Sequence, residues 1–397
     1  MQKILLLYKS FIIRILVLLF ITTFLVYFLT SPGESNYDYF GRLAHAMSEG
    51  KSYLSDNPPW LNELVPIDGK YYVVYPPVPA MLMVPFVFIF GRSDFQTLFS
   101  IILGAINVCL VYVMLSRLKF SRMTALVITL FFGFGTNHWY LASVGSAWFI
   151  AHIAALTFLL LALIEAFGKK RLFLIGVLLG ISFWSRTPII FTVPFFYIYF
   201  YKLFWPLEKK KIINFVLFNL GVGLVVFFDG YYNYIRFGDF SPFSPYNLIP
   251  NLDKDPVFKD GFMSLAFIPR HLEALFMKLP KLQSESPYLI PSLYATAIWF
   301  TSPLLIYIFN FRKNLLFFSS WIGVLGPLVI ILLWAGVGYA QFGYRFAQDF
   351  MPFLLLLVAL GIGKKPSWIA YGLLFLSILV NVWGTILINL YDIWFMG

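Results

Sequence analysis

Apolar runs separated by short polar segments follow one another along almost the whole chain. A helix that crosses a membrane needs about 20 mostly apolar residues, and the pattern predicts about eleven such helices. The expected fold class is therefore all-α, a polytopic transmembrane helical bundle in which residues 1–397 form a single domain. The predicted spans are residues 11–29, 97–115, 123–136, 146–167, 172–185, 188–204, 212–235, 292–311, 315–334, 350–363 and 367–389.

The first apolar run follows Lys3 and Lys9 and includes Arg14, so it resembles a signal sequence. No Ala-x-Ala cleavage site follows it. Its length of about 19 residues is enough to cross a membrane. We therefore expect an uncleaved anchor.

Residues 76–91 are also apolar, and whether they cross the membrane decides the side of every later loop. Their shortness and their four prolines favour a helix that lies in the outer interface or re-enters, over one that crosses. All the short basic clusters then lie in the cytoplasm with the N-terminus, as the positive-inside rule requires. These clusters are Arg117, Lys119 and Arg122; Lys169, Lys170 and Arg171; Lys209, Lys210 and Lys211; Arg312 and Lys313; Lys364 and Lys365.

This topology places two large loops, residues 30–96 and 236–291, on the outer face. Most acidic residues then lie on that face, and only Glu165 and Glu208 lie near the cytoplasm. The expected location is the plasma (inner) membrane, with the N-terminus in the cytoplasm and the active site on the outer face.

The composition agrees with a membrane protein, since 60% of residues are hydrophobic and only 12% are charged. The net charge of +11 comes from clusters between apolar runs, which indicates membrane topology and no nucleic-acid partner. The lone Cys109 rules out a disulfide framework. No Walker loop, CxxC pair or HExxH motif occurs, so nothing indicates an ATP-driven machine.

Two polar motifs in the first outer loop carry candidate chemistry. Asp38 opens a predicted short helix, where it is either a helix cap or a general base that faces a cavity. Lys70 follows an Asp-Gly turn and precedes Tyr75-Pro76-Pro77; it either contacts a phosphate or is an ordinary surface lysine.

Further motifs follow in order along the chain: GFGTNHW at 133–139, WFIAH at 148–152, GISFWSRTP at 180–188, NYIRFG at 233–238 and QFGYRFAQDFMP at 341–352. Together with the acid after the first span and the Tyr-Pro-Pro element, this set resembles the GT-C superfamily of polyprenol-phosphate-sugar-dependent glycosyltransferases. The resemblance is closest to the branch related to protein O-mannosyltransferases and lipopolysaccharide-core sugar transferases, and it covers nearly the whole chain.

The resemblance implies transfer of a sugar, with inversion, from a polyprenyl-phosphate donor in the bilayer to a hydroxyl of a glycan, lipid or protein acceptor. It implies no cofactor and no metal, although a divalent ion between Asp38 and Asp229 is a second interpretation. Many relatives carry two adjacent acids in the first outer loop, whereas Glu34 and Asp38 are four positions apart here. Asp38 fits the base better because it opens the short helix. Relatives commonly end in a soluble outer domain, so this chain is expected to be a core-only version.

Cations at the predicted outer ends of spans are candidates for the donor phosphate. Arg345, Arg186 and Arg236 lie at such ends, and Lys70 lies in the first outer loop. The planar guanidinium binds two phosphate oxygens at once. Arg345 has a structural alternative, an i,i+4 pair with Asp349.

The substrate cavity is expected to include Tyr75, His138, Trp139, His152 and Asp229. His152 lies about 9 Å below the outer end of its helix, where it is either a core histidine or part of a lipid groove. An acid at the position of Asp229 is costly unless it is paired or faces water.

Residues 265–282 are predicted to form a basic amphipathic helix on a membrane surface. Such a helix either covers the bundle or forms a wall for a lipid-linked phosphate.

Two other functions remain open: a lipid or polysaccharide transporter, and a surface-polysaccharide polymerase or ligase with a diphosphate-lipid donor. A transporter would carry charges inside several spans. The charges of this chain collect on one side, which favours an enzyme.

Overall fold

The computed structural model describes residues 2–206 and 208–395, and these are mostly helical. The helices are α1 (Gln2–Leu29), α2 (Tyr39–Ser48), α3 (Val78–Phe90), α4 (Gln96–Arg117), α5 (Arg122–Phe134), α6 (His138–Val144), α7 (Ala147–Phe167), α8 (Leu172–Phe183), α9 (Val193–Tyr199), α10 (Tyr201–Phe204), α11 (Lys209–Phe237), α12 (Ile268–Phe276), α13 (Ile298–Thr301), α14 (Leu315–Leu333), α15 (Met351–Ile362) and α16 (Trp368–Tyr391). The strands β1 (Leu64–Ile67) and β2 (Lys70–Val73) form one antiparallel hairpin, and β3 (Lys281–Leu282) and β4 (Leu289–Ile290) form another.

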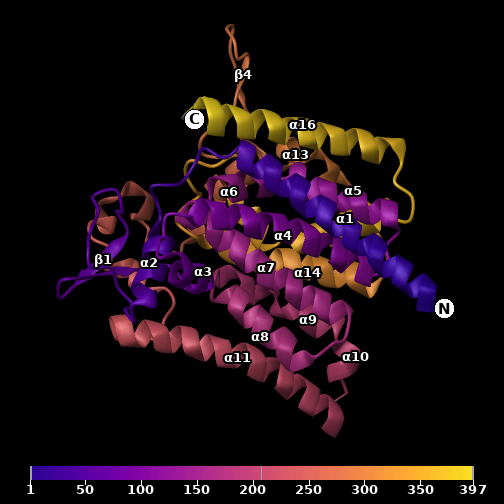
Figure 1. The fold of residues 1–397 in the computed structure, drawn as a ribbon, viewed down its shortest axis with the longest axis horizontal. Coiled ribbons are helices and arrows are strands. Elements are labelled where there is room, and N and C mark those ends of the chain that lie inside the picture. The colour runs from indigo at the N-terminus through magenta and orange to yellow at the C-terminus, as the bar shows by residue number, and fades with distance from the viewer. Residues whose placement is uncertain (1, 207, 396–397) are drawn as a thin grey trace.

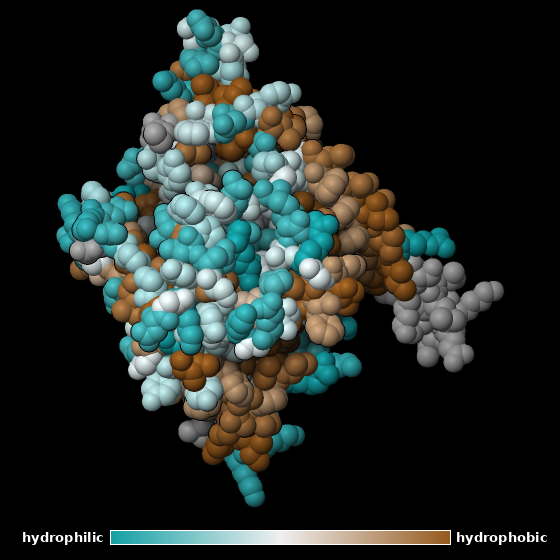
Figure 2. Space-filling model, turned by 60° about the vertical axis from the view of Figure 1, so that its left-hand side comes forward, coloured by the Kyte–Doolittle hydropathy of each residue, from teal (hydrophilic) through white to brown (hydrophobic). Residues whose placement is uncertain are grey.

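Six of the described helices are long and apolar enough to cross a membrane: Phe11–Leu29 within α1, and α4, α7, α11, α14 and α16. Shorter apolar helices, α3, α5, α8, α15 and the segment Thr187–Tyr199, accompany them. The expectation of an all-α, multi-pass membrane protein is confirmed in these terms. Figure 1 shows the long helices side by side, with β1, α2 and α3 at one end and the N-terminus at the other. Figure 2 shows that the end with β1 and α2 is largely hydrophilic, beside a strongly hydrophobic flank.

Helices α8 and α11 make the most extensive helix–helix contact of the bundle, and small residues permit it. A Cβ added to Gly176 of α8 would overlap the carbonyl oxygen of Phe218, and one added to Gly221 of α11 would overlap that of Phe173. The two backbones therefore touch directly, which is how helices associate in lipid without a hydrophobic driving force.

Residues 30–96, the first of the two large loops, fold into α2, the β1–β2 hairpin and α3. Asp68 and Gly69, both with positive φ, form the hairpin turn that the Asp-Gly pair predicts. The segments on both sides of α3 contact the first turn of α2: the Tyr75 ring lies 5.3 Å from that of Tyr39, and Ser93 packs against Gly41. Both ends of α3 are therefore packed against α2.

Three expected helices are corrected by the structure. Residues 188–204 do not form one helix, because a 3₁₀-helix, Thr187–Thr192, is followed by the short helices α9 and α10. Residues 292–311 do not form one span, because the helix α13 ends at Thr301 and a 3₁₀-helix, Pro303–Phe309, follows it. Pro303 lacks an N–H and disfavours helical backbone at Ser302, which explains the break.

The amphipathic helix expected at 265–282 is confined to a 3₁₀ turn, Leu265–Phe267, and α12. Pro280 disfavours helical backbone at the residue before it, and the chain continues instead into the β3–β4 hairpin. This hairpin projects from the bundle beyond α16 (Figure 1).

The glycine contact between α8 and α11 leads to a stability prediction. Gly221→Ala should lower the free energy of unfolding by about 1–3 kcal/mol, because the added methyl group forces the helices apart. Gly223→Ala is the matched control two residues away, since a Cβ there meets no atom within 4 Å. It should leave stability unchanged or raise it slightly. Thermal melting of the purified protein in detergent measures both, and equal melting temperatures would contradict the contact.

Candidate functional site

A cavity of about 1060 Å³ opens at the end of the bundle that carries α2 and β1. Its wall combines the two large loops, residues 30–96 and 236–291, with the start of α7, the turn after α8 and the segment that follows α14. Distant parts of the sequence therefore meet here. The apolar C-terminal end of α14 forms one side of it, with Ile330, Ile331 and then Trp334.

Glu63 contributes a half-buried carboxylate to this cavity. Its backbone N–H donates to the Tyr39 hydroxyl over 3.1 Å, and the Trp148 indole N–H donates to its carboxylate over 3.1 Å. Burial raises the pKa of Glu63, while the Trp148 hydrogen bond and the charge of Arg345 oppose that rise. No cation of the described chain forms a direct ion pair with Glu63.

Arg345 lines the same cavity, and its guanidinium has no ion pair with any described residue. Its Nε is buried without a hydrogen-bond partner. The guanidinium lies 5.7 Å from the Phe149 ring centre and 5.1 Å from that of Phe346. Burial and the neighbouring Arg186 lower the pKa of Arg345 to about 10, so it stays charged at neutral pH.

Arg186 differs from Arg345 because it forms an ion pair, with Asp349. It donates to both carboxylate oxygens of Asp349, at 3.4 and 3.0 Å, and His152 Nδ1 lies 2.7 Å from the same carboxylate. Burial raises the pKa of Asp349, but Arg186 and His152 outweigh it and bring the pKa to about 2. Asp349 is therefore a permanent carboxylate that holds Arg186 at the cavity wall.

This network excludes the expected alternative of an Arg345–Asp349 pair. Both residues lie in a 3₁₀-helix, Arg345–Asp349, with three residues per turn, so positions i and i+4 do not face each other. The guanidiniums of Arg186 and Arg345 instead both lie near the Phe346 ring, at 5.5 and 5.1 Å from its centre.

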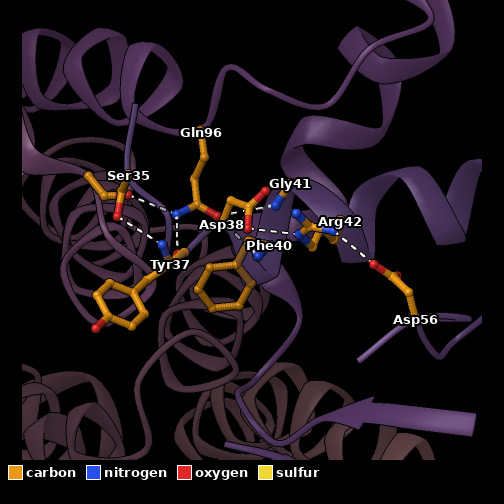
Figure 3. A network of polar contacts seen from close by, with 9 residues as sticks. Ser35, Tyr37, Asp38, Phe40, Gly41, Arg42, Asp56 and Gln96 are labelled. Atoms are coloured by element: carbon orange, nitrogen blue, oxygen red, sulfur yellow. Dashed lines mark hydrogen bonds and ion pairs between the residues drawn. The ribbon is translucent and has the colours of Figure 1, made fainter. Parts of the chain in front are cut away.

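Asp38 does not line the cavity, although its neighbour Tyr37 does. Figure 3 shows its carboxylate directed toward Arg42, at 2.9 Å, and Arg42 also bonds to Asp56 at 3.1 Å. Asp38 precedes α2 without capping it; Gln96 accepts the N–H groups of Phe40 and Gly41 instead.

Glu34 is exposed and accepts the backbone N–H groups of Thr97 and Leu98 at 2.9 and 3.2 Å. It thus caps the start of α4, a structural role that helix termini favour for carboxylates. Lys70 is exposed at the hairpin turn, 4.8 Å from the Tyr53 ring centre, and lies outside the cavity lining.

Arg236 is buried, and all three of its side-chain nitrogens donate within the protein. They bond to the carbonyl oxygens of Val73 at 2.7 Å and Tyr232 at 3.2 Å and to the Asn233 side chain at 2.8 Å. It joins α11 to the β1–β2 hairpin and is not part of the cavity lining. Asp229 is buried on the same helix and is not part of the cavity lining.

His138 and Trp139 are buried away from the cavity lining. A ring nitrogen of His138 lies 3.2 Å from the Gly104 carbonyl, and the Trp139 indole donates to the Thr30 hydroxyl over 2.9 Å.

Of the residues expected from the sequence, the structure brings Tyr75, Arg186 and Arg345 to the cavity, and His152 contacts the Asp349 carboxylate that holds Arg186. Glu63 was missed. The sequence feature that could have indicated it is an acid directly before β1, because the paired strand β2 leads to Tyr75. The sequence did not show that this hairpin forms a cavity wall.

No protein-family model matches the chain, and no curated protein or solved structure matches it either.

The two cavity arginines should differ in their effect on stability. Arg186→Gln removes a charge from the buried Asp349 carboxylate and should cost about 3 kcal/mol of unfolding free energy. Arg345→Gln removes a cation without an ion-pair partner and should leave the melting temperature unchanged or raise it. Thermal melting of both variants is the measurement. A loss in Arg345→Gln as large as in Arg186→Gln would show that Arg345 is a structural residue.

Proposed function

We propose that the protein is a glycosyltransferase that moves a sugar from a polyprenyl-phosphate donor to an acceptor hydroxyl within this cavity. One observation carries the proposal: Glu63, a carboxylate, and Arg345, a cation, line the same cavity, and neither forms a direct ion pair with a described residue. Unpaired, partly buried charges are costly and cluster at functional sites. The motif resemblance to GT-C glycosyltransferases supplies the reaction class.

The proposed base is Glu63, in place of Asp38 or Glu34. As the acceptor oxygen attacks the anomeric carbon, its proton passes to the Glu63 carboxylate. The bond between that carbon and the lipid phosphate oxygen breaks with its electron pair, and the phosphate leaves as an anion. Attack from the face opposite the leaving group inverts the anomeric configuration.

Arg345 and Arg186 would receive the departing phosphate. A preorganised cation in a site with little water stabilises charge that develops in the transition state. Arg186 is held in place by Asp349, and Arg345 has a guanidinium free of ion pairs. The phosphate would therefore lie near Phe346, between the two guanidiniums.

The remaining walls suit the other parts of the substrates. The rings of Tyr37 and Trp148 lie 4.7 Å apart at the wall that carries Glu63, and aromatic faces are suitable surfaces for a sugar ring. The apolar C-terminal end of α14 offers a surface for the polyprenyl chain.

A diphosphate-lipid donor is the second candidate. Arg270 and Lys278, from residues 236–291, also line the cavity, where Lys278 pairs with Glu273 at 3.9 Å and Arg270 is a further cation. The reaction assay therefore includes both polyprenyl-phosphate and polyprenyl-diphosphate sugars. Release of polyprenyl diphosphate, with no release of monophosphate, would select the second candidate.

The base assignment is tested with a carboxamide pair. Glu63→Gln keeps the shape of the side chain but cannot accept the proton, so the transfer rate should fall by about 100-fold or more. Asp38→Asn is the matched control; it removes a partly exposed ion pair of small energetic value and should turn over close to the wild-type rate. The measurement is release of lipid phosphate by the purified protein in lipid nanodiscs, with a panel of hexose and pentose donors.

Two outcomes would contradict the proposal. If Asp38→Asn loses activity and Glu63→Gln keeps it, the base is Asp38. If wild-type protein turns over no donor of the panel, and mass spectrometry finds unchanged surface glycans in a strain that lacks the gene, the glycosyltransferase proposal fails.

The same base predicts a pH dependence. Glu63 must be deprotonated to accept a proton, so the rate falls as pH drops through its pKa. Because burial raises that pKa, the fall should lie above the usual value for glutamate, about 4.3. Trp148→Phe removes the hydrogen bond that favours the carboxylate, so the acidic limb should move to higher pH.

Trp334→Phe changes another tryptophan of the cavity wall and serves as the control. Its pH profile should match the wild type. Equal shifts in the two tryptophan variants would mean that the limb does not report Glu63.

A further inference from the structure

A second cavity, of about 650 Å³, lies at the opposite end of the bundle, between the start of α5 and the loop that leads into α16. Its lining includes the three cations Arg122, Lys364 and Lys365. All three are exposed, and the described residues that line the cavity include no aspartate or glutamate. The site is therefore strongly positive.

Two helix N-termini add to this charge. α5 begins at Arg122 and α16 at Trp368, and neither helix has an acidic residue in its first turn. The positive ends of both helix dipoles therefore lie at the same cavity, where they favour an anion.

A hydrogen bond joins the two segments that line the cavity. The Thr124 hydroxyl donates to the Gly363 carbonyl over 2.7 Å, which joins the start of α5 to the loop before α16. The Ser121 hydroxyl accepts the Thr124 N–H over 3.2 Å and caps α5. The cations thus lie on two segments that hydrogen bonds hold together.

The rim of this cavity is apolar. Met123 and Tyr371 belong to its lining and are 52% and 41% exposed. Trp368 is 82% exposed beside them, and Arg122 packs over the Phe11 ring at 4.9 Å. A charged cavity that borders surface suited to acyl chains fits an anion attached to lipid better than a free anion.

We propose that this second cavity is a binding site for the phosphate headgroup of an anionic membrane lipid. The phosphate lies against Arg122, Lys364 and Lys365, and the acyl chains lie along Met123 and Tyr371. Basic cavities between transmembrane helices bind such headgroups, and each lysine or arginine near an anionic surface adds appreciable attraction. The site is separate from the large cavity and does not depend on the function proposed for that cavity.

Native mass spectrometry of the full-length protein tests the site, with a defined mixture of phosphatidylglycerol, cardiolipin and phosphatidylcholine. Wild-type protein should retain the anionic lipids in preference to phosphatidylcholine. Lys364→Gln/Lys365→Gln should lower that preference about ten-fold or more. The control is Lys169→Gln/Lys170→Gln, which removes two exposed lysines from the α7–α8 loop, outside this cavity. It should retain the wild-type preference.

Three results would overturn the proposal: no preference in the wild type, an equal loss in both double variants, or displacement of the lipid by millimolar inorganic phosphate. An equal loss would mean that only the general positive charge of this face attracts anions. Displacement would mean that the site takes a free phosphate. Equal melting temperatures of the variants in phosphatidylcholine alone ensure that a lost preference does not reflect unfolding.

Discussion

The Asp349 carboxylate is the constraint on which the large cavity depends. It is fully buried and accepts hydrogen bonds from both Arg186 and His152, so it joins the turn after α8 to α7 and to the segment before α15. A buried carboxylate is stable only when such partners surround it. Because Asp349 is paired with Arg186 and His152, it fixes the position of Arg186 and leaves Arg345, which also contacts Phe346, without an ion pair. Arg345 therefore keeps a charge without an ion pair because Asp349 is paired with Arg186. This unpaired charge makes the cavity a candidate site.

Hydropathy was enough to predict most of the bundle. The spans expected at 97–115 and 315–334 are the helices Gln96–Arg117 and Leu315–Leu333. The prediction of a single span at 292–311 was wrong for a specific reason. Apolar composition indicates that a segment can lie in lipid, whereas a continuous helix also requires backbone N–H donors. Pro303 removes one of these donors, and the segment becomes a short helix followed by a 3₁₀ turn.

The site was less predictable because its geometry depends on partners distant in sequence. Asp38 and Glu34 are in the expected loop, but an arginine one turn along the helix neutralises the first and the start of α4 binds the second. Neither contact follows from the position of an acid after a span. Glu63 faces the cavity because Tyr39 and Trp148, from two other elements, hold it there. Arg186 and Arg345 were predictable because they lie at predicted span ends, where their long side chains reach a common depth.

The positively charged side chains at the two ends of the bundle differ in how far they are exposed to solvent. At the end with α2, arginines are partly withdrawn from solvent against aromatic rings, so each needs either a fixed carboxylate or a ligand to offset its desolvation. At the other end, Lys364 and Lys365 stay exposed and lose little solvation. Their attraction to an anion is correspondingly weaker for each charge and more sensitive to salt. The first environment suits a reaction in which charge develops and must be stabilised strongly; the second suits reversible binding of a component that the membrane supplies in excess.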